Sequence, residues 1–463
     1  MFYMYIAICF LLLFRSILTV DKTRPSKLLV LYVGGFRPDY LDIDGLKGFR
    51  SLINNGVNVE YLDPVFPTLT FPNYYSIVTG MYPEKHGLIS DYMFDPLNYE
   101  TFEAGKNPES TKSYWWNSVE PIWISTSKLR ISTYMELAYG CQVAIKNEHP
   151  VYCRPPNNYG SLTMSDVCDG VSEGVKRIAD GSVDFVFTYI DHVNTAGRKY
   201  GPFDKRTRAA VRHVDHLIQR IITETEKLGL SEMLNIVLVS DHGMEYCSPV
   251  FVIDMSRYIV SADVVRFKED GAMLWIWPAD NKIMQVYKHV TSFVKTFNSE
   301  RFEGVYLRKD IPEKYRLGLS YRASPILVVA RPGTYLLPPG QDYPTFVNSS
   351  GQKEPYHGCN GYDARYEEMK AVFIAKGPDF KLNREHGPIK TVDVYQILRY
   401  LLRLDPVESE GVWSRVEDMF VTSNNWNVDK PESRASPQIK TISISTHITG
   451  VMIYMICMNQ SSF

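Results

Sequence analysis

The sequence has almost no excess of charge of either sign. Its 463 residues contain 50 lysines and arginines against 52 aspartates and glutamates, which gives a formal net charge of −2. A protein that binds a nucleic-acid polymer needs a basic face, and this balance gives no indication of one. Internal repeats and low-complexity tracts are also missing, and the composition is that of an ordinary globular protein, with 45% apolar and 22% charged residues.

Cysteine is scarce, and no two cysteines have the C-x-x-C spacing, so a cysteine-based zinc site is not expected. Of the seven cysteines, one lies near each end of the chain and the other five are Cys141, Cys153, Cys168, Cys247 and Cys359. In an oxidising compartment this number predicts one or two disulfides, with an odd cysteine remaining.

Both ends of the chain are apolar. Residues 1–20 form an apolar run that ends at a polar boundary, which is typical of a secretory signal peptide; a signal anchor is the alternative. Residues 408–440 predict a polar linker, and 441–463 an apolar tail, either frayed or part of a lipid-anchor signal. Asn348 begins a glycosylation sequon. We therefore expect a protein that is secreted or anchored by one terminus on the outer face of the plasma membrane.

Buried strands and amphipathic helices alternate along the chain. Continuous apolar runs predict strands buried on both faces at 27–33, 183–190, 235–239 and 371–375. Apolar residues recur at helical spacing over 206–228 and 392–402. This alternation predicts an α/β fold with a mostly parallel sheet. The stretch from about 247 to 355, rich in tyrosine and proline, breaks the rhythm and predicts an inserted cap subdomain.

Polar side chains stand where predicted strands end, which is where an open parallel sheet gathers its chemistry. Asp241 and His242 follow one buried run directly, and both are residue types that bind zinc. Thr70 precedes a helix predicted to begin near Tyr74 with Asn73 as its cap, so that its hydroxyl lies at a helix N-terminus that favours phosphate. Taken alone, each pattern is more typical of an ordinary structural role.

The chain resembles the ectonucleotide pyrophosphatase/phosphodiesterase family in seven segments, in the family's order. They are Gly35-Phe36-Arg37, TFPNYYSIVTGMYPEKHG (70–87), Glu120-Pro121-Ile122-Trp123, Tyr200-Gly201-Pro202, SDHGM (240–244), His357-Gly358 and AVFIAKGPDF (371–380). The resemblance covers residues 25–405 and implies an alkaline-phosphatase-like three-layer α/β sandwich with an inserted cap. It also implies an extracellular hydrolase that uses two zinc ions to cleave nucleotide pyrophosphate or phosphodiester bonds, or in some branches lipid phosphodiesters, with Thr70 as the nucleophile.

The resemblance implies a set of zinc ligands, and three of them are replaced. The matching positions are Thr70, Asp241 and His242 in the first site and His357 in the second; the replaced positions are Gly34 in the first site and Asn194 and Arg198 in the second. Glycine offers no side chain, an amide is a weak zinc ligand, and a guanidinium cannot bind a metal. We therefore expect one weakened zinc site and the loss of the other. The charge of Arg198 could replace part of the missing metal's attraction for phosphate.

Two further positions concern the substrate. Asp91 stands where the family has an asparagine that holds a phosphate oxygen, and a carboxylate there repels phosphate unless it is protonated or turned away. By resemblance, Phe71 would stack on a nucleotide base; a core phenylalanine is the equal alternative.

Other polar residues also have side chains that can bind a metal. Asp39, or Asp191 together with His192, would be substitute metal ligands, although ordinary loop roles are favoured. The cluster formed by His213, Asp215 and His216 is interpreted as an exposed helix face.

Two hypotheses of function follow. The first is a degenerate family member with weak or no hydrolysis, which binds a nucleotide, another phosphodiester ligand or a partner. The second is an active ectoenzyme that works through Thr70 and one retained zinc ion. Loss of one metal from a two-metal displacement costs about 4 kcal/mol, or roughly a thousandfold in rate, which favours the first hypothesis.

Overall fold

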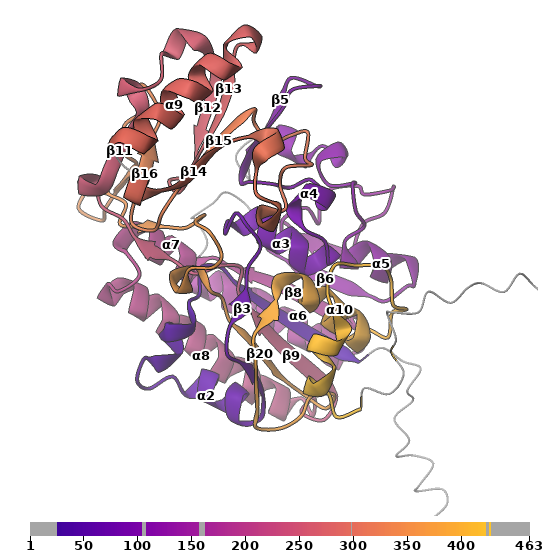
Figure 1. Cartoon of the computed structure of the whole chain (residues 1–463). Helices are drawn as coiled ribbons and strands as arrows, with labels where there is room; N and C mark the ends of the chain where they lie inside the picture. Colours follow the sequence, from indigo (N-terminus) through magenta and orange to yellow (C-terminus); the bar gives the residue numbers. More distant parts are fainter. Residues whose placement is uncertain (1–25, 104–107, 157–162, 298, 423–425, 427–463) are drawn as a thin grey trace, which may run out of the picture. The chain divides into compact units, whose positions relative to one another are not determined.

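An eight-stranded sheet forms the centre of the fold (Figure 1). In spatial order its strands are β21 (Arg384–His386), β2 (Gly56–Val59), β20 (Phe373–Lys376), β9 (Leu234–Val239), β1 (Lys27–Val33), β8 (Phe185–Ile190), β6 (Thr133–Glu136) and β7 (Tyr152–Arg154). Strand β1 runs parallel to both neighbours, whereas β20 is antiparallel to β9 and β2. The predicted α/β fold with a mostly parallel sheet is therefore confirmed.

The computed structural model describes residues 26–103, 108–156, 163–297, 299–422 and 426. The leader predicted at 1–20 and the tail predicted at 441–463 lie outside these residues. None of the helices in the described ranges combines the length and apolar character that a bilayer crossing requires.

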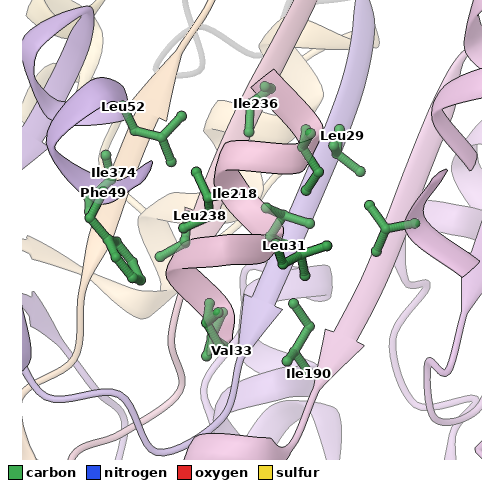
Figure 2. Close-up of a cluster of buried hydrophobic side chains, with 14 of the residues drawn as sticks. Leu29, Leu31, Val33, Phe49, Leu52, Ile190, Ile218, Ile236, Leu238 and Ile374 are labelled. Atoms are coloured by element: carbon green, nitrogen blue, oxygen red, sulfur yellow. The ribbon is translucent and has the colours of Figure 1, made fainter. Parts of the chain in front are cut away.

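Helices cover both faces of the sheet, which is why its central strands consist of apolar residues throughout. One face packs against α2 (Lys47–Asn54), α6 (Met164–Ala179) and α8 (Lys205–Lys227). In Figure 2, Phe49 and Leu52 of α2 lie beside Ile374 of β20, and Ile218 of α8 lies near Leu238 of β9. The opposite side carries α3 (Thr70–Thr79), α5 (Ile122–Lys128) and α10 (Thr391–Leu401), which contact one another.

The cap lies between β9 and β20 in the chain and has its own antiparallel sheet. Its strands, in order, are β12 (Val264–Glu269), β13 (Met273–Pro278), β15 (Ile326–Ala330) and β14 (Phe302–Leu307), with helix α9 (Ile283–Phe297) packed on them. Smaller pairs join β11 (Val252–Asp254) to β16 (Tyr335–Leu337) and β17 (Thr345–Val347) to β18 (Lys353–Pro355). Outside the cap, β3 (Leu62–Asp63) pairs with β22 (Ile389–Lys390), and β4 (Tyr92–Asp95) forms a hairpin with β5 (Glu100–Glu103). The short helix α4 (Pro83–His86) also lies outside the cap.

The chain enters and leaves the cap at one place. There β10 (Glu245–Tyr246) pairs with β19 (Gly358–Cys359), and a disulfide joins Cys247 to Cys359. A second disulfide joins Cys141 to Cys153, and Cys168 is free. The pairing agrees with the one or two disulfides expected from the sequence.

Residues 408–422 differ from the polar linker predicted at 408–440. Trp413 is buried and stacks on Phe420 with ring centroids 5.5 Å apart, and both rings pack against Tyr400 of α10. The few apolar residues of this segment are spaced irregularly, so the sequence shows no periodic face although the segment folds onto the body. The rest of the predicted linker, except Trp426, lies outside the described residues.

Candidate functional site

A cavity of about 560 Å³ lies at the carboxyl ends of the central strands, with the cap forming part of its wall. Its lining includes Thr70 and Phe71 of α3, Asp91, Asn194 and Arg198 of α7 (His192–Tyr200), Asn360, and Lys268 and Asp270 at the end of β12. Thr70, Asn194, Arg198 and Asp91, which the sequence analysis selected, are therefore brought together by the fold.

Thr70 is the first residue of α3, so the helix begins four residues before the predicted start. Pro72 is compatible with this start because the N–H groups of a first helical turn have no partner within the helix. Asn73 does not cap the helix. Its buried side chain accepts a hydrogen bond from the Val65 N–H at 2.8 Å and donates to the carbonyl of Leu69 at 2.9 Å, which fixes the loop that precedes Thr70.

His242 presents a ring nitrogen to the Thr70 hydroxyl. The Nδ1 atom lies 2.7 Å from the carbonyl oxygen of Gly243, which can only accept, so Nδ1 carries a hydrogen. In the neutral ring, Nε2 is then an acceptor, and it lies 3.3 Å from Thr70 Oγ1 and 3.1 Å from Nδ2 of Asn360. The unprotonated nitrogen is therefore directed at the candidate nucleophile, as a metal ligand would be.

Asp241 has one oxygen that is satisfied and one that is not. Its Oδ1 atom accepts hydrogen bonds from the backbone N–H groups of Gly35 and His242, both at 2.8 Å. Its Oδ2 atom is buried without a donor in the described part of the chain and lies 3.4 Å from His242 Nε2. A buried carboxylate oxygen without a partner is costly, and a cation beside it would remove that cost.

The residues present fit one divalent cation in part. Asp241 Oδ2, His242 Nε2 and Thr70 Oγ1 would hold it, but two ionisable ligands and a hydroxyl are fewer than a closed zinc site requires. Within the described ranges no group of three or more histidine, cysteine, aspartate or glutamate side chains could hold a metal.

The replaced positions do not fit a second metal. Nδ2 of Asn194 donates to Asp191 Oδ1 at 3.0 Å, while its buried Oδ1 has no donor among the described residues. At Gly34, an added Cβ would lie 2.9 Å from the hydroxyl of Tyr189, which therefore occupies part of the space that a longer side chain would need. Arg198 adds a permanent positive charge to the same wall.

His357 is expected as a metal ligand, and this role stays a prediction: its buried Nδ1 atom has no hydrogen-bond partner in the described part of the chain. Its backbone N–H donates to the carbonyl of Arg198 at 3.0 Å, and its ring stacks on Tyr246 with centroids 5.9 Å apart. His357 is not a lining residue of the cavity, and neither are Asp241 and His242, whereas Asn360 lines it and contacts His242. Sequence reasoning missed Asn360 because an asparagine after a His-Gly pair carries no signal of its own.

Asp91 is a carboxyl group of the site whose pKa is raised by its surroundings. Its Oδ1 atom accepts from the backbone N–H of Phe71 at 2.8 Å. The surrounding protein raises the pKa of Asp91 to about 7, mainly by desolvation, and Asp270 raises it further, while the Phe71 N–H and Arg198 oppose the shift. Burial also raises the pKa of Asp270. Near neutral pH, Asp91 therefore changes between a neutral acid and a carboxylate.

Phe71 is a core residue, which was the alternative to base stacking. It borders the cavity, but only 2% of the residue is exposed. Its ring packs against Tyr139, Phe102 and Trp116 at centroid distances of 4.9, 5.5 and 6.0 Å. With 2% of the residue exposed, the core role is favoured, and stacking of a nucleotide base on Phe71 stays a prediction.

The substitute ligands are engaged elsewhere. Asp39 forms a bidentate pair with Arg37, with both N···O distances 2.8 Å. Asp191 accepts hydrogen bonds from Tyr189 at 2.7 Å, from Asn194 and from Thr195. Asp191 lines the candidate cavity, and it also lines a second cavity of about 260 Å³ together with its neighbour His192.

Of the cluster expected on an exposed helix face, two residues are exposed and one is buried. His213 and His216 are exposed. Asp215 is buried, and its Oδ1 atom accepts from the Phe49 N–H of α2 at 2.9 Å. Its role is to join α8 to α2.

Asn348 lies in the turn between β17 and β18 and is partly exposed. Its Oδ1 atom accepts from the N–H groups of Ser350 and Gln352, both at 2.9 Å, and Nδ2 donates to Glu354. Glycosylation at this position stays a prediction.

Residues 28–363 match the family model described as type I phosphodiesterase/nucleotide pyrophosphatase. The mouse bis(5'-adenosyl)-triphosphatase is 31% identical over 440 residues, which cover 94% of this chain and 89% of the relative. Human ectonucleotide pyrophosphatase/phosphodiesterase family member 5 is 26% identical over 418 residues, which cover 90% of this chain and 83% of that protein.

Solved structures match as well. The murine ectonucleotide pyrophosphatase/phosphodiesterase 5, in an inactive form in complex with AMP, superposes with a TM-score of 0.75 at 28% identity. That comparison covers 85% of this chain and all of the murine chain. The human counterpart gives a TM-score of 0.77 at 26% identity.

Proposed function

Because the chain belongs to the type I phosphodiesterase/nucleotide pyrophosphatase family, we propose that it binds a nucleotide or another phosphate ester at Thr70 and hydrolyses it slowly or not at all. The observation that carries this proposal is the composition of the cavity wall. Asn194 and Arg198 stand in that wall at replaced ligand positions, and Gly34 is the third replaced position. Asp241 and His242 are the remaining ionisable candidate ligands, and His242 lies beside Thr70 and Asn360 of the wall.

The structures of relatives support nucleotide binding, since the murine protein was solved with AMP. The mouse relative is named a bis(5'-adenosyl)-triphosphatase, so diadenosine triphosphate is the natural substrate to test beside simpler esters. An extracellular location, secreted or on the outer face of the plasma membrane, is part of the proposal. The two disulfides support it, because disulfides persist in oxidising compartments.

A slow hydrolase with one zinc ion is the second candidate. Three possible donor atoms favour it, namely Asp241 Oδ2, His242 Nε2 and Thr70 Oγ1. The Nε2 atom lies 3.4 Å from Asp241 Oδ2 and 3.3 Å from Thr70 Oγ1. A divalent cation bound there would supply positive charge that favours the ionised threonine hydroxyl. Asn360 then acts as a hydrogen-bond donor beside His242 rather than as a strong ligand.

The test is the hydrolysis of a chromogenic thymidine-monophosphate ester and of diadenosine triphosphate by the full chain, with and without added zinc. The Thr70→Ala variant is the control. We expect AMP binding by calorimetry and a rate close to that of Thr70→Ala. A zinc-dependent rate that Thr70→Ala abolishes, at values typical of the family's enzymes, would replace this proposal with the second candidate.

A further inference from the structure

Arg198 has a guanidinium group that the protein does not use. In the described part of the chain its side chain makes no hydrogen bond, ion pair or ring contact. The residue is exposed and lines the same cavity as Thr70. A guanidinium has five N–H donors in a rigid planar fork that matches two oxygens of a phosphate. These donors are available to a ligand without breaking any contact in the protein.

The backbone that carries Arg198 is fixed. Its carbonyl accepts the His357 N–H at 3.0 Å, and this contact attaches the last turn of α7 to the chain that returns from the cap. Close approach also holds the two segments together, because an added Cβ on Gly358 would lie 2.1 Å from the Gly197 carbonyl oxygen. The backbone that carries the guanidinium is therefore fixed, so that only the Arg198 side chain has to be ordered when an anion binds.

The positive charge of Arg198 acts on two carboxyl groups of the cavity wall. It opposes the rise in the pKa of both Asp91 and Asp270, and all three residues line the same cavity. Neither forms an ion pair with it. Lys268 adds a second positive charge on the cap side, where its Nζ atom lies 5.0 Å from the ring centroid of Tyr92. The N-terminus of α3 at Thr70 also favours a bound anion, because the helix dipole is positive there.

The positive charge of Arg198 disfavours a divalent cation beside it, since like charges repel. We propose that Arg198 binds the terminal phosphoryl group of a phosphate monoester directly, so that the cavity holds this anion without any divalent cation. The inference rests on the proposed function and deepens it, because it assigns the phosphate contact to a residue of this chain instead of a metal. Arg198 is then the residue that determines selectivity for a phosphorylated ligand over the bare nucleoside.

The experiment is calorimetric titration of the full chain with AMP, methyl phosphate and adenosine, first in EDTA and then with zinc. In EDTA, we expect wild-type protein to bind AMP and methyl phosphate with a Kd within about threefold of that in zinc. Arg198→Gln should weaken both by at least about tenfold, the equivalent of about 1.4 kcal/mol. Arg198→Lys should recover part of the loss, and adenosine binding should not respond to either change.

The matched control is Arg212→Gln, which removes an exposed arginine of α8 that does not line the cavity and should leave every Kd unchanged. AMP binding that disappears in EDTA and returns with zinc would overturn the inference and leave the proposed function standing. So would an Arg198→Gln variant that binds as wild type does. If AMP binds in neither buffer, the proposed function fails, and this inference with it.

Discussion

Asp91 couples ligand binding to pH. Because its pKa is raised to about 7, it is mostly protonated below neutral pH and then does not repel a phosphate oxygen, whereas above neutral pH it is a carboxylate. We expect the affinity for cyclic AMP, whose single negative charge does not titrate in this range, to fall by about tenfold between pH 6 and pH 8.5.

Asp91→Asn should remove this dependence, because the amide keeps the acceptor for the Phe71 N–H and has no charge to gain. Calorimetric titrations of both proteins at four pH values measure the effect. The assigned role of Asp91 would be contradicted if the wild-type affinity for cyclic AMP did not change between pH 6 and pH 8.5. It would also be contradicted if the affinity of the variant changed with pH as much as that of the wild type.

The replaced ligands can be restored, and the structure specifies at which positions. Gly34→Asp, Asn194→Asp and Arg198→His together return two carboxylates and an imidazole, and we expect zinc affinity to rise by at least about a hundredfold. Gly34→Asp requires the Tyr189 hydroxyl to shift. Competition with a chromogenic chelator measures the affinity.

Adding Asn360→His to the three changes should raise zinc affinity again, because position 360 contacts His242. His357→Ala should leave the affinity unchanged, since its ring stacks on Tyr246 outside the cavity. Loss of zinc binding in His357→Ala would confirm the ligand role expected from the sequence.

Helix α3 depends on the loop before it, and Asn73 holds that loop. Its side chain makes hydrogen bonds to Val65, Pro67 and Leu69, all while fully buried. Asn73→Ala should lower the free energy of unfolding by about 2–4 kcal/mol, because several buried groups lose their partner at once. Urea denaturation measures this change.

Asn55→Ala is the matched control, since it removes one exposed amide bond to Ser51 at the end of α2. It should cost less than about 0.5 kcal/mol. Equal losses in the two variants would show that Asn73 does not hold the loop.

At the level of elements, the sequence predicts the strands well and the start of α3 poorly. Strand β1 has the predicted bounds, and α8 begins and ends one residue before its predicted limits, because apolar runs and helical periodicity are local properties. The start of α3 was misplaced because Asn73 has the residue type of a cap but bonds a loop whose position depends on the fold. The same reason applies to Phe71: a motif gives a residue's type and order, whereas its burial depends on the packing around it.

The disulfide between Cys247 and Cys359 closes a loop of 112 residues that contains the cap. Closing a loop of this length reduces the entropy of the unfolded chain by the equivalent of about 4–5 kcal/mol. The double change Cys247→Ser and Cys359→Ser should therefore lower the free energy of unfolding by up to that amount in chemical denaturation. Cys168→Ser, which removes the free thiol, should change it by less than about 1 kcal/mol.

The same closure has a consequence for a protein cut by a protease. A single cleavage anywhere between Cys247 and Cys359 would leave Asp241 and His242 on one fragment and Asn360 on the other. The disulfide would keep the two pieces together, so that they separate on a gel only after reduction. Because the sheet and the contact between His242 and Asn360 lie outside the cleaved segment, a nicked chain would retain its cavity floor. The segment that carries Asp241 and His242 and the segment that carries Asn360 would therefore stay together even when the backbone of the cap is cut.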